Sequence, residues 1–310
     1  MTKSVFIDGG AGTTGLEILD RLSGRSEFTL IALDDDKRKD MTARREALND
    51  ADFAILCLPD EAVADAAAMV TNTNTAIIDA SSVHRTNLAW TYGFAELRSG
   101  QRESIAASKR VSNPGCYPTG FLALIAPLVQ AKLIPEDWPY TVNAVSGYSG
   151  GGKGLIERFG EEANIGFRAY GLDLAHKHLP EMQVHAGLSL PPLFAPSVIR
   201  AFRGMLVEVP LPISVMPGSD SPEEMRDCLT QHYARSALVN VHQDLAPSEL
   251  LILEDQNPTD KLDLYVMASN DGRQIRLVAM LDNLGKGASG AAVQNLNIMA
   301  GLDEVAGLRL

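Results

Sequence analysis

Short apolar runs alternate with amphipathic segments along the first third of the chain. Glycine, proline or acidic residues bound the apolar runs, as is typical of buried strands, and the segments between them have helical spacing. Repeated strand–helix alternation is typical of a parallel sheet with helices on both faces. The pattern therefore predicts an α/β domain of the Rossmann type, with strands over 5–7, 28–33, 53–58 and 76–79, and helices over 14–22, 37–49 and 61–70.

The pattern changes after about residue 140. Longer apolar stretches separated by prolines predict strands over 205–209, 264–269 and 274–281, and hence a mixed or antiparallel sheet of an α+β domain. A helix is expected after Ser221, because serine caps it, Pro222 suits its first turn and Glu224 completes a capping box. The segment 283–301 predicts a last helix, which could pack against either domain.

Composition restricts the class of protein. A chain of 310 residues is long enough for two domains, and 45% hydrophobic with 21% charged residues is ordinary for a soluble globular protein. The net charge of −12 makes nucleic acid and membrane surfaces poor partners. Three widely spaced cysteines indicate no disulfide framework and no zinc ribbon, and fit a reducing cytoplasm. No signal peptide and no membrane-spanning run is recognised.

A glycine-rich turn follows the first predicted strand and opens the first predicted helix. Glycines allow the backbone to approach a pyrophosphate, and the helix N-terminus presents free N–H groups to its negative charge. In this strand–turn–helix context the turn is assigned to a dinucleotide, the alternative being a turn without a ligand. The residues assigned are Gly10, Ala11, Gly12, Thr13, Thr14 and Gly15.

Charged residues after the second strand bear on the choice of cofactor. An acid there usually binds a ribose hydroxyl, whereas a cation accommodates a 2′-phosphate. The segment 34–39 offers both, with Lys37 and Arg38 as candidates for the phosphate. A solvated charge run is an equal alternative, so the residues alone only favour NADP(H) over NAD(H).

Cys116 is the candidate nucleophile. It follows an Asn-Pro-Gly turn, lies ahead of a helix predicted over 120–133, and is followed by Pro118, which suits a first helical position. The positive end of that helix would lower the pKa of the thiol and favour the attacking thiolate. A buried structural cysteine is the alternative, and it is the interpretation for Cys57, in a predicted strand, and Cys228, in a predicted helix.

Two histidines close together provide a possible acid–base partner. His176 and His178 would point the same way if their segment were extended, and Glu181 could orient one imidazole. Which histidine transfers the proton stays open, with His176 preferred. A metal-binding pair is the rival interpretation, but no third ligand is evident nearby, and no metal is expected.

Three further polar stretches are candidates for binding anions. Arg85 follows the fourth strand, where the ligand crevice of an open parallel sheet lies. The glycine-rich loop 146–153 can form a nest of N–H groups, or can be a flexible linker. A third cluster spans 283–290. From these stretches and the turn before Cys116, the substrate is assigned to Arg85, Asn113, Ser146, Gly147 and Lys153. The cofactor is additionally assigned to Ser81, Ser149, Gly150, Asn283, Lys286 and Gly287.

Four stretches together resemble the N-acetyl-gamma-glutamyl-phosphate reductases, of the shorter type found in bacterial arginine biosynthesis. They are 112–119, 146–153, 176–181 and 282–295, in the family's order and spread over nearly the whole chain. The first and last are shared with aspartate-semialdehyde dehydrogenases and indicate only the superfamily, whereas His-Lys-His-Leu-Pro-Glu at 176–181 is more specific. Two departures are Lys153, where many relatives have arginine, and a chain shorter than the more common form.

The resemblance implies a Rossmann domain followed by a glyceraldehyde-phosphate-dehydrogenase-like domain. The expected NADP-binding domain is 1–115, rejoined by 283–310, and the catalytic and oligomerisation domain is 116–282. The resemblance also implies NADP(H), a cytoplasmic homodimer or homotetramer, and a small acyl-phosphate substrate. The implied reaction reduces N-acetyl-glutamyl 5-phosphate to N-acetylglutamate 5-semialdehyde and phosphate through a thioester on Cys116.

Two alternatives remain open. An aspartate-semialdehyde dehydrogenase shares the chemistry, and its substrate has a free α-amino group and one fewer methylene. A non-enzymatic NADP-sensing module belongs to another class, and in it Cys116 would be unreactive.

Overall fold

The computed structural model describes residues 2–217, 221–243 and 247–310, and the chain divides into two compact units. Unit 1 comprises Met1–Ala95, Gly100–Pro114 and Ala288–Leu308, and unit 2 comprises Glu96–Ser99, Gly115–Gly287 and Arg309–Leu310. The return to unit 1 comes after Gly287, later than the predicted 283. The reason is that Asn283 donates to Ser149 Oγ (2.9 Å) and accepts from Gly204 N–H (3.0 Å), both within unit 2.

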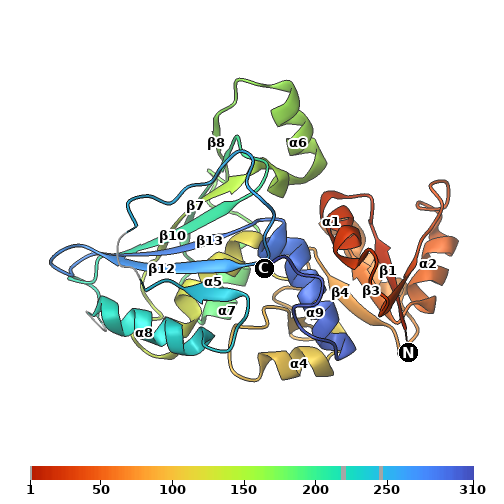
Figure 1. Cartoon of the computed structure of the whole chain (residues 1–310), viewed down its shortest axis with the longest axis horizontal. Helices are drawn as coiled ribbons and strands as arrows, with labels where there is room; N and C mark the ends of the chain where they lie inside the picture. Colours follow the sequence, from red (N-terminus) through yellow and green to blue (C-terminus); the bar gives the residue numbers. More distant parts are fainter. Residues whose placement is uncertain (1, 218–220, 244–246) are drawn as a thin grey trace. The chain divides into compact units, whose positions relative to one another are not determined.

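Unit 1 contains a six-stranded, all-parallel sheet in the order β2-β1-β3-β4-β6-β5. Figure 1 labels β1, β3 and β4 of this sheet. β3 and β4 are buried at every position, as expected for strands covered on both faces. This confirms the predicted Rossmann-type sheet. The strands are β1 (Lys3–Asp8), β2 (Phe28–Ile31), β3 (Phe53–Leu56), β4 (Ala76–Asp79), β5 (Thr91–Tyr92) and β6 (Arg110–Ser112).

The helices of unit 1 are α1 (Thr13–Leu22), α2 (Met41–Asp50), α3 (Asp60–Met69), α4 (Gln101–Ala107) and α9 (Gly290–Ala300). The helix predicted from residue 37 begins later, because Asp40 is its N-cap and accepts a hydrogen bond from Ala43 N–H (2.7 Å). The predicted strands 28–33 and 53–58 each end two residues early, so Cys57 lies just after β3 rather than within it.

Helix α9 completes the core of unit 1 from the far end of the sequence. It packs against α1, α4 and β4 (Figure 1). Its Val293 and Leu296 are fully buried in one cluster with Val5, Ile18 and Ile55. Unit 1 is therefore assembled from both ends of the chain.

Unit 2 contains a seven-stranded mixed sheet in the order β11-β12-β13-β10-β7-β9-β8. Its strands are β7 (Thr141–Gly147), β8 (Phe167–Ala169), β9 (Leu193–Ile199), β10 (Met205–Leu211), β11 (Val239–Val241), β12 (Leu262–Ala268) and β13 (Ile275–Leu281). Its helices are α5 (Cys116–Gln130), α6 (Gly152–Glu161), α7 (Leu179–Ala186) and α8 (Pro222–Tyr233), with a 3-10 turn at Tyr148–Gly151. The predicted α+β class is confirmed, and so is the cap of α8, where Ser221 Oγ accepts from Glu224 N–H (3.2 Å).

The two faces of this sheet differ. Helices α5 and α8 pack on one face (Figure 1), where α5 contacts β10 and β13 so closely that a Cβ on Gly120 would lie 2.8 Å from Val207. Strand alternation turns Leu206, Tyr265 and Met280 to the opposite face, where they are half-buried. The nucleophile candidate stands at the start of α5, on the helix-covered side.

Candidate functional site

Cys116 is the first residue of α5. The helix begins four residues before the predicted start at residue 120, with Gly115 as its N-cap, so Pro118 occupies the third position rather than the first. A proline is tolerated there because the first-turn N–H groups have no partner within the helix. The half-buried thiol therefore lies at the positive end of a 15-residue helix whose interior is buried.

Glu181 lies next to the same helix start. Its buried carboxylate Oε1 accepts a hydrogen bond of 2.7 Å from the backbone N–H of Gly115, the residue before Cys116. Glu181 is in the first turn of α7, and α7 packs against α5. This contact with the nucleophile loop was not predicted, because no sequence spacing connects residues 115 and 181.

The two histidines lie together, but not for the predicted reason. Their segment is a turn rather than an extended strand, and His178, with helical backbone angles (φ −82°, ψ −12°), is the N-cap of α7. The turn places the ring centroids of His176 and His178 4.8 Å apart. It also lets His178 N–H donate to His176 Nδ1 (3.2 Å). That contact leaves the proton of a neutral His176 on Nε2.

The environment of His176 favours the neutral ring. Burial lowers its pKa from the ordinary value, and the positive charge of Lys177 lowers it further, while Asp173 raises it. Tyr117, the residue after Cys116, packs against both rings, with centroids 6.3 Å from His176 and 6.0 Å from His178. The histidine pair and the nucleophile candidate therefore belong to one cluster within unit 2.

Tyr170 and Arg168 extend this cluster and were missed from the sequence. The Tyr170 ring lies 5.5 Å from that of His176, and its hydroxyl interacts with that of Tyr117. Burial raises the pKa of Tyr170 to about 12, so it stays protonated at neutral pH. The guanidinium of half-buried Arg168 lies 4.7 Å above the Tyr170 ring. Neither residue stands in a motif. Their positions follow from the pairing of Arg168 in β8 with β9 and from the hydrogen bond of Tyr170 N–H to Pro196 O (3.3 Å).

The glycine-rich loop is more buried than a surface linker would be. Ser146 and Ser149 are almost inaccessible, Ser146 Oγ donates to Gly147 O (3.0 Å), and Ser149 Oγ accepts from Asn283. Gly150 packs against the same asparagine. Lys153, in contrast, is exposed in the first turn of α6. The loop and the 283–290 cluster thus lie together, and Lys153 is the one cation among them at the surface.

Lys286, predicted to bind the cofactor, has a buried partner. Its Nζ lies 2.8 Å from Glu96 Oε2, and each side chain is only 1% exposed. Gly287 next to it contacts the nucleophile, since a Cβ added there would be 2.9 Å from the Cβ of Cys116. Both belong to unit 2, and the assignment of Lys286 to the cofactor stays a prediction.

Unit 1 holds the predicted dinucleotide turn. Gly9 has φ +85°, and a side chain there would collide with Cys57 O. A Cβ on Gly15 would lie 2.6 Å from Gly10 Cα, so α1 can approach the turn only with glycine at this position. A cavity of about 680 Å³ adjoins the turn, and its lining includes Gly9, Gly10, Ala11, Asp35, Arg38, Lys39 and Arg44.

The cations of this cavity differ in how they are held. Arg38 is exposed and pairs with Asp35 (2.8 Å), whereas Arg44 makes two contacts with the buried carboxylate of Asp8, at 2.7 and 3.2 Å. Lys37 does not line the cavity, while Lys39 and Arg44, which the sequence analysis did not assign, do. Arg44 was missed because it stands in α2, beyond the charge run.

The predicted anion residues of unit 1 surround the carboxyl ends of β4 and β6. Arg85 is buried and donates to Asn113 O (3.0 Å) and Ala80 O (3.2 Å). Asn113 donates to Ala288 O and accepts from Asn295. The side chains of both residues thus contribute to the scaffold of unit 1, and their assignment to the substrate stays a prediction.

Asp79, at the end of β4, organises the neighbouring loop. Its fully buried carboxylate accepts from Ser81 N–H (2.8 Å) and Ser81 Oγ (2.9 Å), and lies 2.7 Å from His84 Nδ1. The His84 ring stacks on Trp90 at 4.0 Å. His84 was given no role from the sequence, although its position five residues after a strand-ending aspartate was a usable signal.

Comparisons with known proteins decide the family. Family models of the semialdehyde dehydrogenase NAD binding domain and dimerisation domain match residues 4–107 and 116–283. The N-acetyl-gamma-glutamyl-phosphate reductase of Trichormus variabilis is 47% identical over 98% of each chain. N-acetyl-gamma-glutamyl-phosphate reductase 2 of Pseudomonas putida is 49% identical over 97% of each. The chain belongs to the N-acetyl-gamma-glutamyl-phosphate reductase family.

Solved structures agree on the fold of this reductase family member. Aspartate semialdehyde dehydrogenase II from Vibrio cholerae, complexed with ASA, has a TM-score of 0.73 at 17% identity, covering 97% of this chain and 99% of that one. The Francisella tularensis aspartate semialdehyde dehydrogenase has a TM-score of 0.70 at 14% identity, covering 96% and 100%. These comparisons confirm the resemblance and the fold class stated from the sequence.

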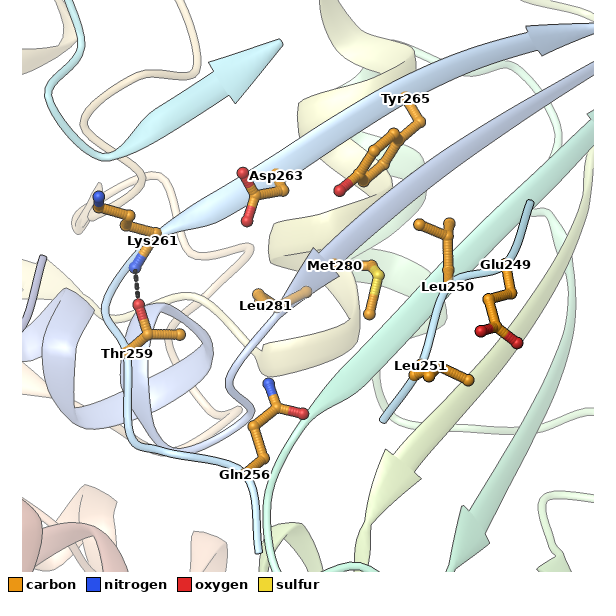
Figure 2. Close-up of a pocket in the computed structure, with 10 residues that line it drawn as sticks. All are labelled: Glu249, Leu250, Leu251, Gln256, Thr259, Lys261, Asp263, Tyr265, Met280 and Leu281. Atoms are coloured by element: carbon orange, nitrogen blue, oxygen red, sulfur yellow. Dashed lines mark hydrogen bonds between the residues drawn. The ribbon is translucent and has the colours of Figure 1, made fainter. Parts of the chain in front are cut away.

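A second pocket of this reductase lies in unit 2, on the sheet face opposite α5. It has a volume of about 480 Å³ and lies between the segment 249–261 and strands β12 and β13 (Figure 2). Figure 2 shows Asp263, Tyr265 and Met280 on the strands, and Lys261 N–H donating to Thr259 Oγ1 (3.2 Å).

Within the described ranges, no helix is long and apolar enough to cross a membrane, and no group of three metal-ligating side chains is found.

Proposed function

We propose that the chain reduces N-acetyl-glutamyl 5-phosphate to N-acetylglutamate 5-semialdehyde and phosphate with NADPH. The observation that carries this proposal is the position of Cys116 at the first residue of a buried helix, with His176 packed on the adjacent Tyr117. Family membership supports the same reaction, because relatives 47–49% identical bear the name of this reductase.

Cys116 acts as the nucleophile in this proposal. Its thiolate attacks the acyl carbon, the carbon–oxygen bond to phosphate breaks, and phosphate leaves with the bonding electrons. A nicotinamide dinucleotide, when bound, would supply the hydride that reduces the acyl carbon. The carbon–sulfur bond then breaks, which releases the aldehyde and regenerates the thiolate. Passing through a thioester divides one difficult displacement into two easier steps.

His176 donates a hydrogen bond in this scheme. Because its Nδ1 accepts from His178 N–H, the neutral ring carries its proton on Nε2, which suits donation to an oxygen that gains negative charge. Backbone N–H groups in the first turn of α5 are further donors to that oxygen. His178, the alternative acid–base group, is the residue whose N–H fixes the His176 tautomer.

Two cations of unit 2 are proposed to bind the substrate's anionic groups. Lys153 is exposed beside the glycine-rich loop. Arg168 lies on Tyr170 in the cluster that contains His176. A guanidinium recognises a carboxylate through two parallel hydrogen bonds, so Arg168 suits the substrate's α-carboxylate and Lys153 its phosphate.

The cavity of unit 1 fits a nicotinamide dinucleotide. A side chain at Gly9 would collide with Cys57 O, and one at Gly15 would collide with the backbone of Gly10, so glycine at both positions allows the tight turn and close helix packing of a dinucleotide-binding fold. Arg38, Lys39 and Arg44 line the same cavity and would hold a 2′-phosphate, which supports NADP(H) over NAD(H). Asp35 pairs with Arg38 and the buried Asp8 pairs with Arg44. The three cations of the lining nevertheless exceed its two carboxylates by one charge, so a net positive charge remains in the cavity.

The reverse reaction tests the proposed function. Purified protein is mixed with NADP⁺, phosphate and N-acetylglutamate semialdehyde, and absorbance is followed as NADPH forms. Phosphate-dependent NADPH formation is expected, and Cys116→Ala should abolish it without weakening NADPH binding. Activity only with aspartate semialdehyde would keep the chemistry and change the substrate. Inactivity of folded protein with both aldehydes, or full activity of Cys116→Ala, would refute the proposal.

The same protein is proposed to be a homo-oligomer that associates through the sheet face opposite α5. Leu206, Tyr265 and Met280 on that face are half-buried apolar side chains, and the matched family model of this unit is described as a dimerisation domain. Light scattering should give the wild type a molar mass that is a multiple of 33.3 kDa. For Leu206→Asp the molar mass should shift toward that of the 33.3 kDa monomer. A monomeric wild type would contradict it.

A further inference from the structure

The ion pair of Glu96 and Lys286 is buried inside unit 2. Glu96 begins a short segment of unit 2 between two stretches of unit 1, and Lys286 stands in the π-helical turn Gly285–Ser289. Their charged atoms are 2.8 Å apart, and both side chains are 1% exposed. Glu96 is fixed further, because its backbone oxygen lies 2.8 Å from His232 Nε2 on α8.

Stability alone explains such a pair poorly. The free energy lost by removing two charges from water is comparable to the free energy gained from their attraction. A buried ion pair is therefore weak evidence for a stabilising role. A single charge left without its partner is, in contrast, strongly destabilising. The geometric result of the pair is that Lys286, and with it the π-helical turn, is fixed relative to α8.

The turn in question touches the nucleophile. Gly285 packs against Thr259 O, and Gly287 packs against Cys116, with an added Cβ only 2.9 Å from the Cβ and 3.3 Å from the Cα of that residue. The backbone oxygen of Asp282 accepts from both Gly285 N–H and Gly287 N–H at 3.0 Å. Lys286 is the residue between these two glycines, and its side chain connects the turn to Glu96.

We propose that the Glu96–Lys286 pair is a positioning device for the nucleophile: it holds the π-helical turn so that Gly287 sets the orientation of Cys116. This inference rests on the proposed function only in giving Cys116 a catalytic role. It assigns to Lys286 a role other than contact with a cofactor. It also explains why a π-helical turn, a form that is rare and frequent at functional sites, stands at this point of the chain.

Two variants separate positioning from stability. Lys286→Met removes the positive charge beside the buried Glu96 carboxylate and should lower the Tm, whereas Glu96→Gln with Lys286→Met removes both charges and should restore it. Both variants should nevertheless keep a roughly 10- to 100-fold lower kcat with KM nearly unchanged, because misplacing a reacting atom by about 1 Å costs this much. Alkylation of Cys116 by iodoacetamide should slow in parallel. A double variant with wild-type Tm, alkylation rate and kcat would overturn the proposal.

Gly287→Ala tests the contact of Gly287 with Cys116 directly. It tests the positioning role even if the double variant does not fold. Slower alkylation of Cys116 and a lower kcat are expected, whereas alkylation at the wild-type rate would refute the inference. Arg158→Gln, which removes the exposed pair with Glu162 on α6, should change neither. Alkylation needs no substrate, so it tests the positioning role independently of the proposed function. If the wild type had no reductase activity but the variants still altered the alkylation rate, the positioning role would stand and the proposed function would be rejected.

Discussion

Glu181 Oε1 accepts a hydrogen bond of 2.7 Å from the backbone N–H of Gly115. A buried carboxylate therefore stands at the N-terminus of the helix that begins with Cys116. The partial positive charge of that terminus stabilises any anion close to it. The Glu181 carboxylate and a Cys116 thiolate would both be stabilised by this same partial charge. Glu181 fixes the loop before the nucleophile, and its charge opposes thiolate formation.

Replacing Glu181 by glutamine should make Cys116 more reactive at lower pH. The amide oxygen can keep the hydrogen bond to Gly115, but the negative charge is lost, so the pH midpoint of iodoacetamide alkylation should fall by roughly 0.5–1 unit. Glu181→Ala, which also loses the hydrogen bond, serves as the control and should lower the Tm as well. An unchanged or higher midpoint in Glu181→Gln would show that the carboxylate has no electrostatic effect on the thiol.

Alkylation at neutral pH should modify Cys116 alone. Burial, assisted by Asp79 and Asp8, raises the pKa of Cys57 to about 12, and burial also raises the pKa of Cys228. A thiol with a pKa near 12 is thiolate in only about 1 molecule in 10⁵ at pH 7, and the thiolate is the reactive species. Peptide mass spectrometry should find one carbamidomethyl group in the native wild type and none in Cys116→Ala. Equal labelling of Cys57 in folded protein would contradict this expectation.

The pKa of His176 should change in opposite directions in two surface variants. After burial, Lys177 is the largest influence that lowers the pKa of His176, whereas Asp173 raises it. Lys177→Met should therefore raise the pKa and Asp173→Asn should lower it, each by a fraction of a pH unit because both groups are exposed. NMR titration of the His176 ring measures both, and each variant is the control for the other. Shifts of the same sign would show that charge is not the cause.

The sequence predicted local features well where one short segment carries the whole signal. The glycine turn of residues 10–15, the cap at Ser221 and the strand Ala76–Asp79 were each predicted from adjacent residues, and the structure has them. The start of α5 was predicted four residues late, since Asn-Pro-Gly suggests a longer turn than the one that forms.

Contacts between distant segments could not be predicted in this way. Glu181 on Gly115, Arg168 on Tyr170 and Glu96 on Lys286 depend on how the strands and helices pack, and no periodicity records this. The extended geometry expected for His176 and His178 was wrong because His178 caps α7. The pair nevertheless came together, since a tight turn also brings residues two apart close to one another.

Cofactor preference should depend on Arg38 more than on its partner Asp35. The exposed pair contributes little to stability, so Arg38→Gln should leave the Tm nearly unchanged. A hydrogen bond to a charged phosphate is worth about 1.5–3 kcal/mol, so this change should raise the KM for NADPH roughly 10-fold or more and leave that for NADH unchanged. Asp35→Asn should instead lower the KM for NADPH slightly, because it frees Arg38 from a competing carboxylate. Equal loss with both cofactors in Arg38→Gln would mean that Arg38 supports the cavity without recognising a 2′-phosphate, and would leave Lys39 and Arg44 as the residues that could do so.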